Sequence, residues 1–75
     1  MNINNLSQDE INDILFCLAE CINEIYGKDI EEAKSIVYNS SFPELLKKMP
    51  EFILHYNFEY WAEEIMNAYK NNNNQ

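Results

Sequence analysis

The sequence contains no arginine, and its five basic residues, all lysines, face thirteen acidic residues, which gives a formal net charge of −8. Proteins that bind nucleic acid or anionic membranes draw much of their affinity from cations that displace counterions from phosphate. The charge therefore predicts neither direct nucleic-acid binding nor attachment to a membrane. A basic protein partner fits this charge better, and the plainer interpretation is that the charge only keeps the protein soluble.

Long hydrophobic runs are also missing. No apolar stretch approaches the about 20 residues that a membrane-spanning helix needs, and the first residues lack the basic flank and apolar core of a signal peptide. We therefore expect a cytoplasmic protein in a reducing environment. Cys17 and Cys21 agree with this, because they lie one turn apart on one predicted helix, where an unstrained disulfide is difficult to form.

Glycine and proline are scarce, with one glycine and two prolines in 75 residues. Apolar residues make up 47% of the chain and aromatic residues 13%, which suffices for one small core. We predict an all-α fold, a small bundle of four to five helices in a single domain over residues 1–70. The asparagine-rich residues 71–75 are expected to be a disordered tail.

The longest uninterrupted helical pattern covers residues 8–26. Ser7 and Glu10 have the spacing of a capping box at its start, and Gly27 can take the left-handed conformation that ends a helix. Its apolar residues recur at steps of three and four, which is typical of a helix with one buried stripe. The residues expected in this stripe are Ile11, Ile14, Leu15, Leu18, Ile22 and Ile25.

Two further helices are predicted over residues 30–38 and 42–49. Pro43 falls in the first turn of the second of them, where its missing amide costs nothing, and Pro50 ends that helix. Each helix has the spacing of a capping box at its start. The two boxes pair Asp29 with Glu32 and Ser41 with Glu44. The side chains expected to face inward are Ile30, Ala33, Ile36, Val37, Phe42, Leu45, Leu46 and Met49.

The last third of the chain is expected to hold one helical turn and one longer helix. Residues 51–55 form a short apolar run that fits a helix or a strand, and the preceding Pro50 favours a helical turn. Asn57 then caps a helix over residues 58–70. Its expected inward residues are Phe58, Trp61, Ala62, Ile65 and Tyr69.

Three residues could form a metal or catalytic site, namely Cys17, Cys21 and His55. A structural zinc site normally needs four ligands, and cysteines on the flank of a buried stripe behave as small apolar residues. His55 has no nucleophile or orienting carboxylate at motif spacing, so a structural role at a helix end is favoured over acid–base chemistry. We predict no catalytic residue, no metal and no cofactor, and hence a protein that is not an enzyme.

Two aromatic residues depart from the helical pattern. Phe16 and Tyr60 each fall on the acidic face of a predicted helix, where rings supply binding energy and carboxylates steer a partner. Alternatively, a second layer of core covers Phe16, and Tyr60 lies at an exposed edge. The candidate partner-binding residues are Phe16, Asp13, Glu20, Tyr60, Glu63 and Glu64.

Four short motifs over about residues 15–66 carry a resemblance to a known family. They are Phe16-Cys17-Leu18, Phe42-Pro43-Glu44-Leu45-Leu46, Leu54-His55-Tyr56 and Glu59-Tyr60-Trp61-Ala62-Glu63-Glu64-Ile65. With them the chain resembles a family of small bacterial all-helical proteins of unknown function. Members are often encoded beside toxin-like proteins of the ADP-ribosyltransferase type, so the resemblance implies an antitoxin or accessory role. The chain departs from the family at Tyr56-Asn57, where members tend to have threonine and glycine, and at Trp61.

These observations lead to one functional hypothesis and one alternative. The first is a non-enzymatic acidic interaction module that binds another, basic protein and inhibits or neutralises it, as an antitoxin or as an inhibitor from a phage or mobile element. In a sharper form of this hypothesis the acidic surface mimics nucleic acid. The alternative is a homo-oligomeric structural or regulatory domain, such as a homodimer, whose aromatic residues meet their own copies.

Overall fold

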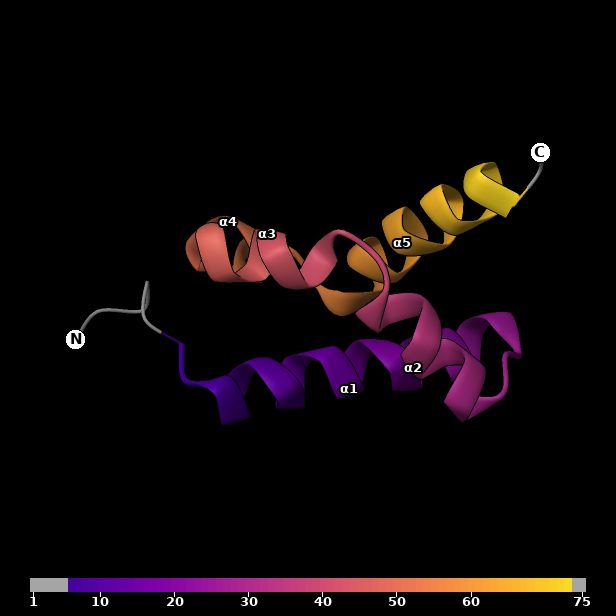
Figure 1. Cartoon of the computed structure of the whole chain (residues 1–75), viewed down its shortest axis with the longest axis horizontal. Helices are drawn as coiled ribbons and strands as arrows, with labels where there is room; N and C mark the ends of the chain where they lie inside the picture. Colours follow the sequence, from indigo (N-terminus) through magenta and orange to yellow (C-terminus); the bar gives the residue numbers. More distant parts are fainter. Residues whose placement is uncertain (1–5, 74–75) are drawn as a thin grey trace.

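The computed structural model describes residues 6–73, with side chains as far as Asn71. Within this range the chain forms five helices and no strand, which confirms the predicted all-α bundle. The helices are α1 (Gln8–Tyr26), α2 (Ile30–Tyr38), α3 (Phe42–Lys48), α4 (Pro50–His55) and α5 (Phe58–Asn73). Helix α1 is the central element, since α2, α3 and α5 all pack against it. In Figure 1, α1 runs along one side of the molecule, and α3, α4 and α5 lie along the other.

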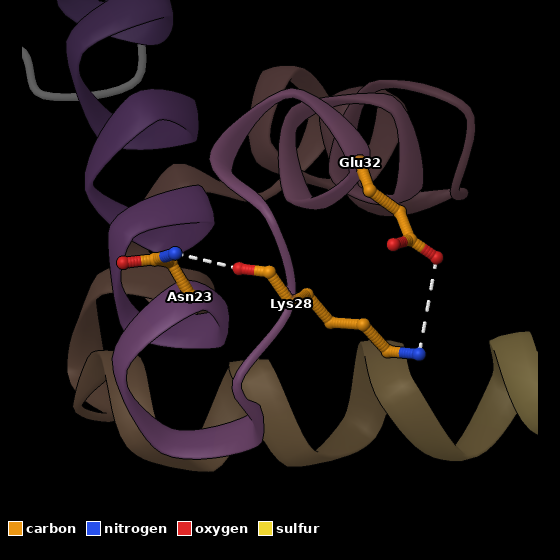
Figure 2. A network of polar contacts seen from close by, with 3 residues as sticks. All are labelled: Asn23, Lys28 and Glu32. Atoms are coloured by element: carbon orange, nitrogen blue, oxygen red, sulfur yellow. Dashed lines mark hydrogen bonds and ion pairs between the residues drawn. The ribbon is translucent and has the colours of Figure 1, made fainter.

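The start and end of α1 follow the predicted caps. Ser7 Oγ accepts a hydrogen bond from the Glu10 amide at 3.1 Å, and Glu10 Oε1 accepts one from the Ser7 amide at 2.8 Å. Gly27 ends the helix with φ of 70°, a conformation that residues with a Cβ rarely adopt. The turn to α2 is held by Asn23 Nδ2, which donates to the Lys28 carbonyl at 2.6 Å (Figure 2).

The predicted capping box of α2 is only half correct. Asp29 caps the helix by accepting a hydrogen bond from the Glu31 amide at 3.1 Å. Glu32 does not complete the box, because its carboxylate instead lies 3.8 Å from Lys28 Nζ, on the preceding turn (Figure 2). A lysine four residues before a glutamate thus competes with the reciprocal cap.

The capping box predicted for α3 is wrong. Ser41 has helical backbone angles and makes no side-chain cap, whereas an N-cap residue normally has an extended backbone. Its neighbour Ser40 takes over: the hydroxyl donates to the Val37 carbonyl at 2.6 Å and accepts from the Phe42 amide at 3.1 Å. One serine therefore joins the end of α2 to the start of α3. Glu44, the predicted box partner, lies 3.9 Å from Lys48 Nζ.

Several helix boundaries differ from the expectation by one to three residues. Helix α3 ends at Lys48, and α4 begins at Pro50, so Met49 alone connects them. Residues 51–55 are helical, as favoured, and Asn57 Oδ1 accepts from the Tyr60 amide at 2.8 Å as the predicted cap of α5. Helix α5 continues to Asn73 rather than ending at residue 70, because each added residue gains one backbone hydrogen bond. Residues 74–75 of the predicted tail lie outside the described residues.

The core lies between α1 and the other helices. Most predicted inward residues are buried or half-buried, but Ile25 and Met49 are 51% and 43% exposed, so their placement in the core was wrong. The buried sector of α1 is centred on Leu15 and Ile22, which leaves Ile25 on its flank, and Met49 lies where the chain leaves the helix. Three further core residues, Ala19, Ile53 and Met66, were not predicted. The buried apolar residues are Ile11, Leu15, Leu18, Ala19, Ile22, Ala33, Ile36, Val37, Phe42, Leu46, Ile53, Trp61, Ala62, Ile65 and Met66.

Candidate functional site: an aromatic surface on α4 and α5

The structure exposes all six predicted partner-binding residues but divides them between two helices. One group lies on α1 and the other on α5, and no hydrogen bond, ion pair or ring contact within residues 6–71 joins them. The α1 group is Asp13, Phe16 and Glu20, and the α5 group is Tyr60, Glu63 and Glu64. Their partner-binding role stays a prediction.

Phe16 lies outside the core rather than beneath a second apolar layer. Its side chain is 41% exposed, and Lys34 Nζ from α2 lies 6.0 Å from the ring centroid. A lysine over an aromatic face is an attractive arrangement. This cation comes from the chain itself, so the Phe16 ring already has a cation–π contact within the molecule.

Tyr60 belongs to a larger cluster, in which three exposed rings surround one buried indole. We call the exposed part, formed by Phe52, Tyr56 and Tyr60, the aromatic surface. Its rings are 50%, 40% and 40% exposed, respectively. Their centroids lie 6.0, 5.8 and 4.8 Å from that of Trp61, each edge-on. Tyr56 and Tyr60 also stack on each other, with centroids 4.7 Å apart and an angle of 23° between the ring planes.

Trp61 fixes this cluster from below. Its side chain is 7% exposed, and its Nε1 donates to the Ile53 carbonyl in α4 at 2.7 Å, which satisfies the only polar group of the indole. On the other side the ring packs at 5.7 Å against Phe42 of α3. Three helices therefore meet at Trp61, and the exposed rings rest on a fixed support.

The stretch of chain that holds the aromatic surface is acidic. From residue 51 to residue 69 the chain has four glutamates and no lysine. These glutamates, all exposed, are Glu51, Glu59, Glu63 and Glu64. The ion pairs within the described part of the chain join other residues, namely Lys28 with Glu32, Lys34 with Glu31 and Lys48 with Glu44. The four carboxylates thus have no cation of their own.

The residues considered for a metal site are not gathered. Cys17 and Cys21 are free and half-buried in α1, while His55 is exposed at the end of α4, with its ring 5.2 Å from that of Tyr56. No group of three or more histidine, cysteine or acidic side chains in the described residues could hold a metal ion. Burial, followed by the carboxylate of Glu24, raises the pKa of the Cys21 thiol, which disfavours the thiolate that metals bind.

A groove lies between α2 and α5. This groove has a volume of about 420 Å³, and its lining includes Glu32, Ser35, Asn39, Ile65 and Tyr69. The wall is formed by hydroxyl, amide and apolar groups around one carboxylate, and that carboxylate lies beside Lys28. Within the described residues, no hydrogen bond joins Glu32 to a serine of this lining.

Sequence reasoning found Tyr60 but missed Phe52 and Tyr56 as members of the same surface. A signal was present, because five of the ten residues from 52 to 61 are aromatic. That density was assigned partly to the core and partly to an ambiguous helical turn. Periodicity within α5 cannot place a ring of α4, since their meeting depends on the turn at Tyr56 and Asn57.

None of the described helices combines the length and apolar character that crossing a membrane would require. Comparison of the chain with models of known protein families, with curated proteins and with solved structures gives no match. The resemblance to the small bacterial family therefore stays a prediction.

Proposed function

We propose that the chain is an acidic, non-enzymatic interaction module that binds another protein through the aromatic surface. The observation that carries this proposal is the exposure of Phe52, Tyr56 and Tyr60 above a fixed Trp61. Tyrosine and tryptophan supply much of the energy of protein interfaces, and clustered apolar exposure on a small domain marks binding sites. Rings that are already packed against one another lose little conformational freedom on binding.

The charge supports the same proposal. A net charge of −8 accelerates encounter with a basic partner and disfavours acidic ones. Binding of this kind inhibits a partner when it covers the partner's own working surface. The antitoxin-like and nucleic-acid-mimic hypotheses are both special cases of this proposal.

The test compares the chain with single variants. The immobilised chain is used to capture a partner from a lysate of the native host, and the partner is then purified and titrated by calorimetry. Tyr60→Ala is expected to weaken binding by about 2 kcal/mol, or about thirtyfold. Tyr38 on α2 provides a matched control, because it is 45% exposed but lies outside the aromatic surface. Tyr38→Ala should bind like the unchanged chain.

Two results would contradict the proposal. The first is equal loss of binding in Tyr60→Ala and Tyr38→Ala, which would place the interface elsewhere. The second is concentration-dependent self-association in light scattering that Tyr60→Ala abolishes, which would favour the homo-oligomeric alternative. For the mimic hypothesis, the captured partner should release DNA when the chain binds, and simultaneous binding of both would exclude mimicry.

A further inference from the structure

We infer that the partner segment seated on the aromatic surface presents arginine, whose guanidinium stacks on the exposed Tyr60 or Tyr56 ring and pairs with Glu63 or Glu64. This inference rests on the proposed function and specifies the chemistry of the partner. It is carried by the geometry of the two tyrosines, by the position of the carboxylates, and by the lack of a lysine over these rings among the described residues.

The stacked tyrosines leave both side chains partly exposed. Each ring turns one face toward the other, at 4.7 Å between centroids, and each remains 40% exposed. Aromatic faces attract cations, and the planar guanidinium of arginine stacks on them better than the compact ammonium of lysine. The two rings are held edge-on against Trp61, so a binding face is formed before the partner arrives.

The chain already uses this contact twice with its own lysines. Lys34 Nζ lies 6.0 Å from the Phe16 ring centroid, and Lys28 Nζ lies 5.9 Å from that of Tyr69. No cation of the described residues lies in this way over the aromatic surface. The aromatic surface therefore has three exposed rings without a lysine from the described part of the chain.

Two carboxylates lie one helical turn from Tyr60 on α5. Glu63 and Glu64 follow Tyr60 by three and four residues on α5, which places their side chains on the neighbouring helix surface. Neither takes part in an ion pair within the described part of the chain. Carboxylates bind guanidinium with two parallel hydrogen bonds, a geometry that an ammonium cannot match. One arginine can thus contact a ring and a carboxylate together.

The same charges disfavour a second copy of this chain as the occupant. Two chains that met through the aromatic surface would bring their unpaired glutamates together, and each molecule carries a net charge of −8. Like charges placed across an interface oppose association. A basic segment removes this repulsion and replaces it with attraction.

The test uses short capped peptides of alanine and leucine that carry two arginines one helical turn apart. Matched peptides replace arginine with citrulline, which keeps the shape without the charge, or with lysine. Binding to the full chain is followed through the tyrosine ring signals in NMR spectra. The arginine peptide is expected to bind about tenfold more tightly than the citrulline peptide and about threefold more tightly than the lysine peptide.

Variants locate the effect. Glu63→Gln with Glu64→Gln should remove most of the preference for arginine over citrulline, and Tyr60→Leu should weaken binding of the arginine peptide. Asp9→Asn with Glu24→Gln is the matched control, because it removes the same charge from exposed positions on α1. This control variant should keep the preference for the arginine peptide over the citrulline peptide. Circular dichroism of each variant verifies that the helices remain.

The outcomes separate this inference from the proposed function. Equal binding of the arginine and citrulline peptides, absence of binding up to about 1 mM, or an equal loss of preference in both charge variants would overturn the inference. A partner captured through Tyr60 would still support the proposed function in each of these cases. Sedimentation could instead show a dimer that Tyr60→Leu abolishes and Tyr38→Leu leaves intact. That result would show that a second copy of the chain occupies the aromatic surface, and it would overturn both the inference and the proposed function.

Discussion

At the scale of single residues, Trp61 determines whether the aromatic surface exists. Its indole contacts all three exposed rings and Phe42, and its only donor is used by the Ile53 carbonyl. The sequence prediction placed Trp61 in the buried stripe of the last helix, which is correct. Its contact with α4, by contrast, follows from the turn between α4 and α5 and could not be derived from helical periodicity.

We expect Trp61→Phe to lower the free energy of unfolding by about 1–3 kcal/mol, because it removes a buried hydrogen bond and leaves unfilled volume. Urea denaturation followed by circular dichroism measures this change. Tyr60→Phe removes only an exposed hydroxyl and should change the stability by less than about 0.5 kcal/mol. Similar effects of the two substitutions would show that the indole does not support the cluster.

Cys21 provides a pH-dependent test at the same scale. Its pKa is raised, mainly by burial and then by Glu24 and Glu59, so the folded chain keeps its proton at a pH where the unfolded chain has released it. The resulting stabilisation is complete below the unfolded pKa and is lost as the pH rises through the folded pKa. We expect iodoacetamide to alkylate Cys21 more slowly in the folded chain than in urea, and Glu59→Gln to speed the folded reaction. Equal rates in both states would contradict this.

At the scale of helices and turns, caps were predictable where the capping residue has no competitor. Ser7, Gly27 and Asn57 act as their spacing indicates. The boxes assigned to Asp29 and Ser41 did not form as predicted, since lysines one turn away engage the required glutamates and the Ser40 hydroxyl bonds both helix ends. Sequence patterns therefore located the helix starts well. Which of the two adjacent serines bonds the start of α3 depends on how α2 and α3 are placed relative to each other.

The two serines allow a direct comparison. Ser40→Ala removes one hydrogen bond to the end of α2 and one to the start of α3, so we expect a loss of about 1–2 kcal/mol in the free energy of unfolding. Ser41→Ala removes no cap and should be neutral within about 0.5 kcal/mol. Thermal or urea unfolding measures both. The reverse order would show that Ser41, as the sequence suggested, caps α3.

At the scale of the whole molecule, the fold class and the acidic exterior were predictable, because both depend on periodicity and composition. The candidate site was predictable only in part. Tyr60, Glu63 and Glu64 stand out by their position on α5, whereas Phe52 and Tyr56 join them only because the chain turns twice, at Met49 and after His55. These turns arise between short helices, and a helical wheel drawn for each segment cannot place one segment relative to another.

The net charge also predicts two salt dependences of opposite sign. In the folded chain, unpaired carboxylates repel one another, so sodium chloride from about 0.02 to 0.2 M should raise the free energy of unfolding by about 1 kcal/mol. The same screening should weaken binding of the arginine peptide several-fold, because in the complex the carboxylates attract the guanidinium groups. Urea titrations and NMR binding measure the two effects. Glu63→Gln with Glu64→Gln should reduce the salt dependence of both stability and peptide affinity, since it removes charges that contribute to each.

Stability that falls with salt would mean that the ion pairs of Lys28, Lys34 and Lys48 outweigh the repulsion among the remaining carboxylates. A peptide affinity that is unchanged by salt would mean that the glutamates beside the aromatic surface take no part in binding.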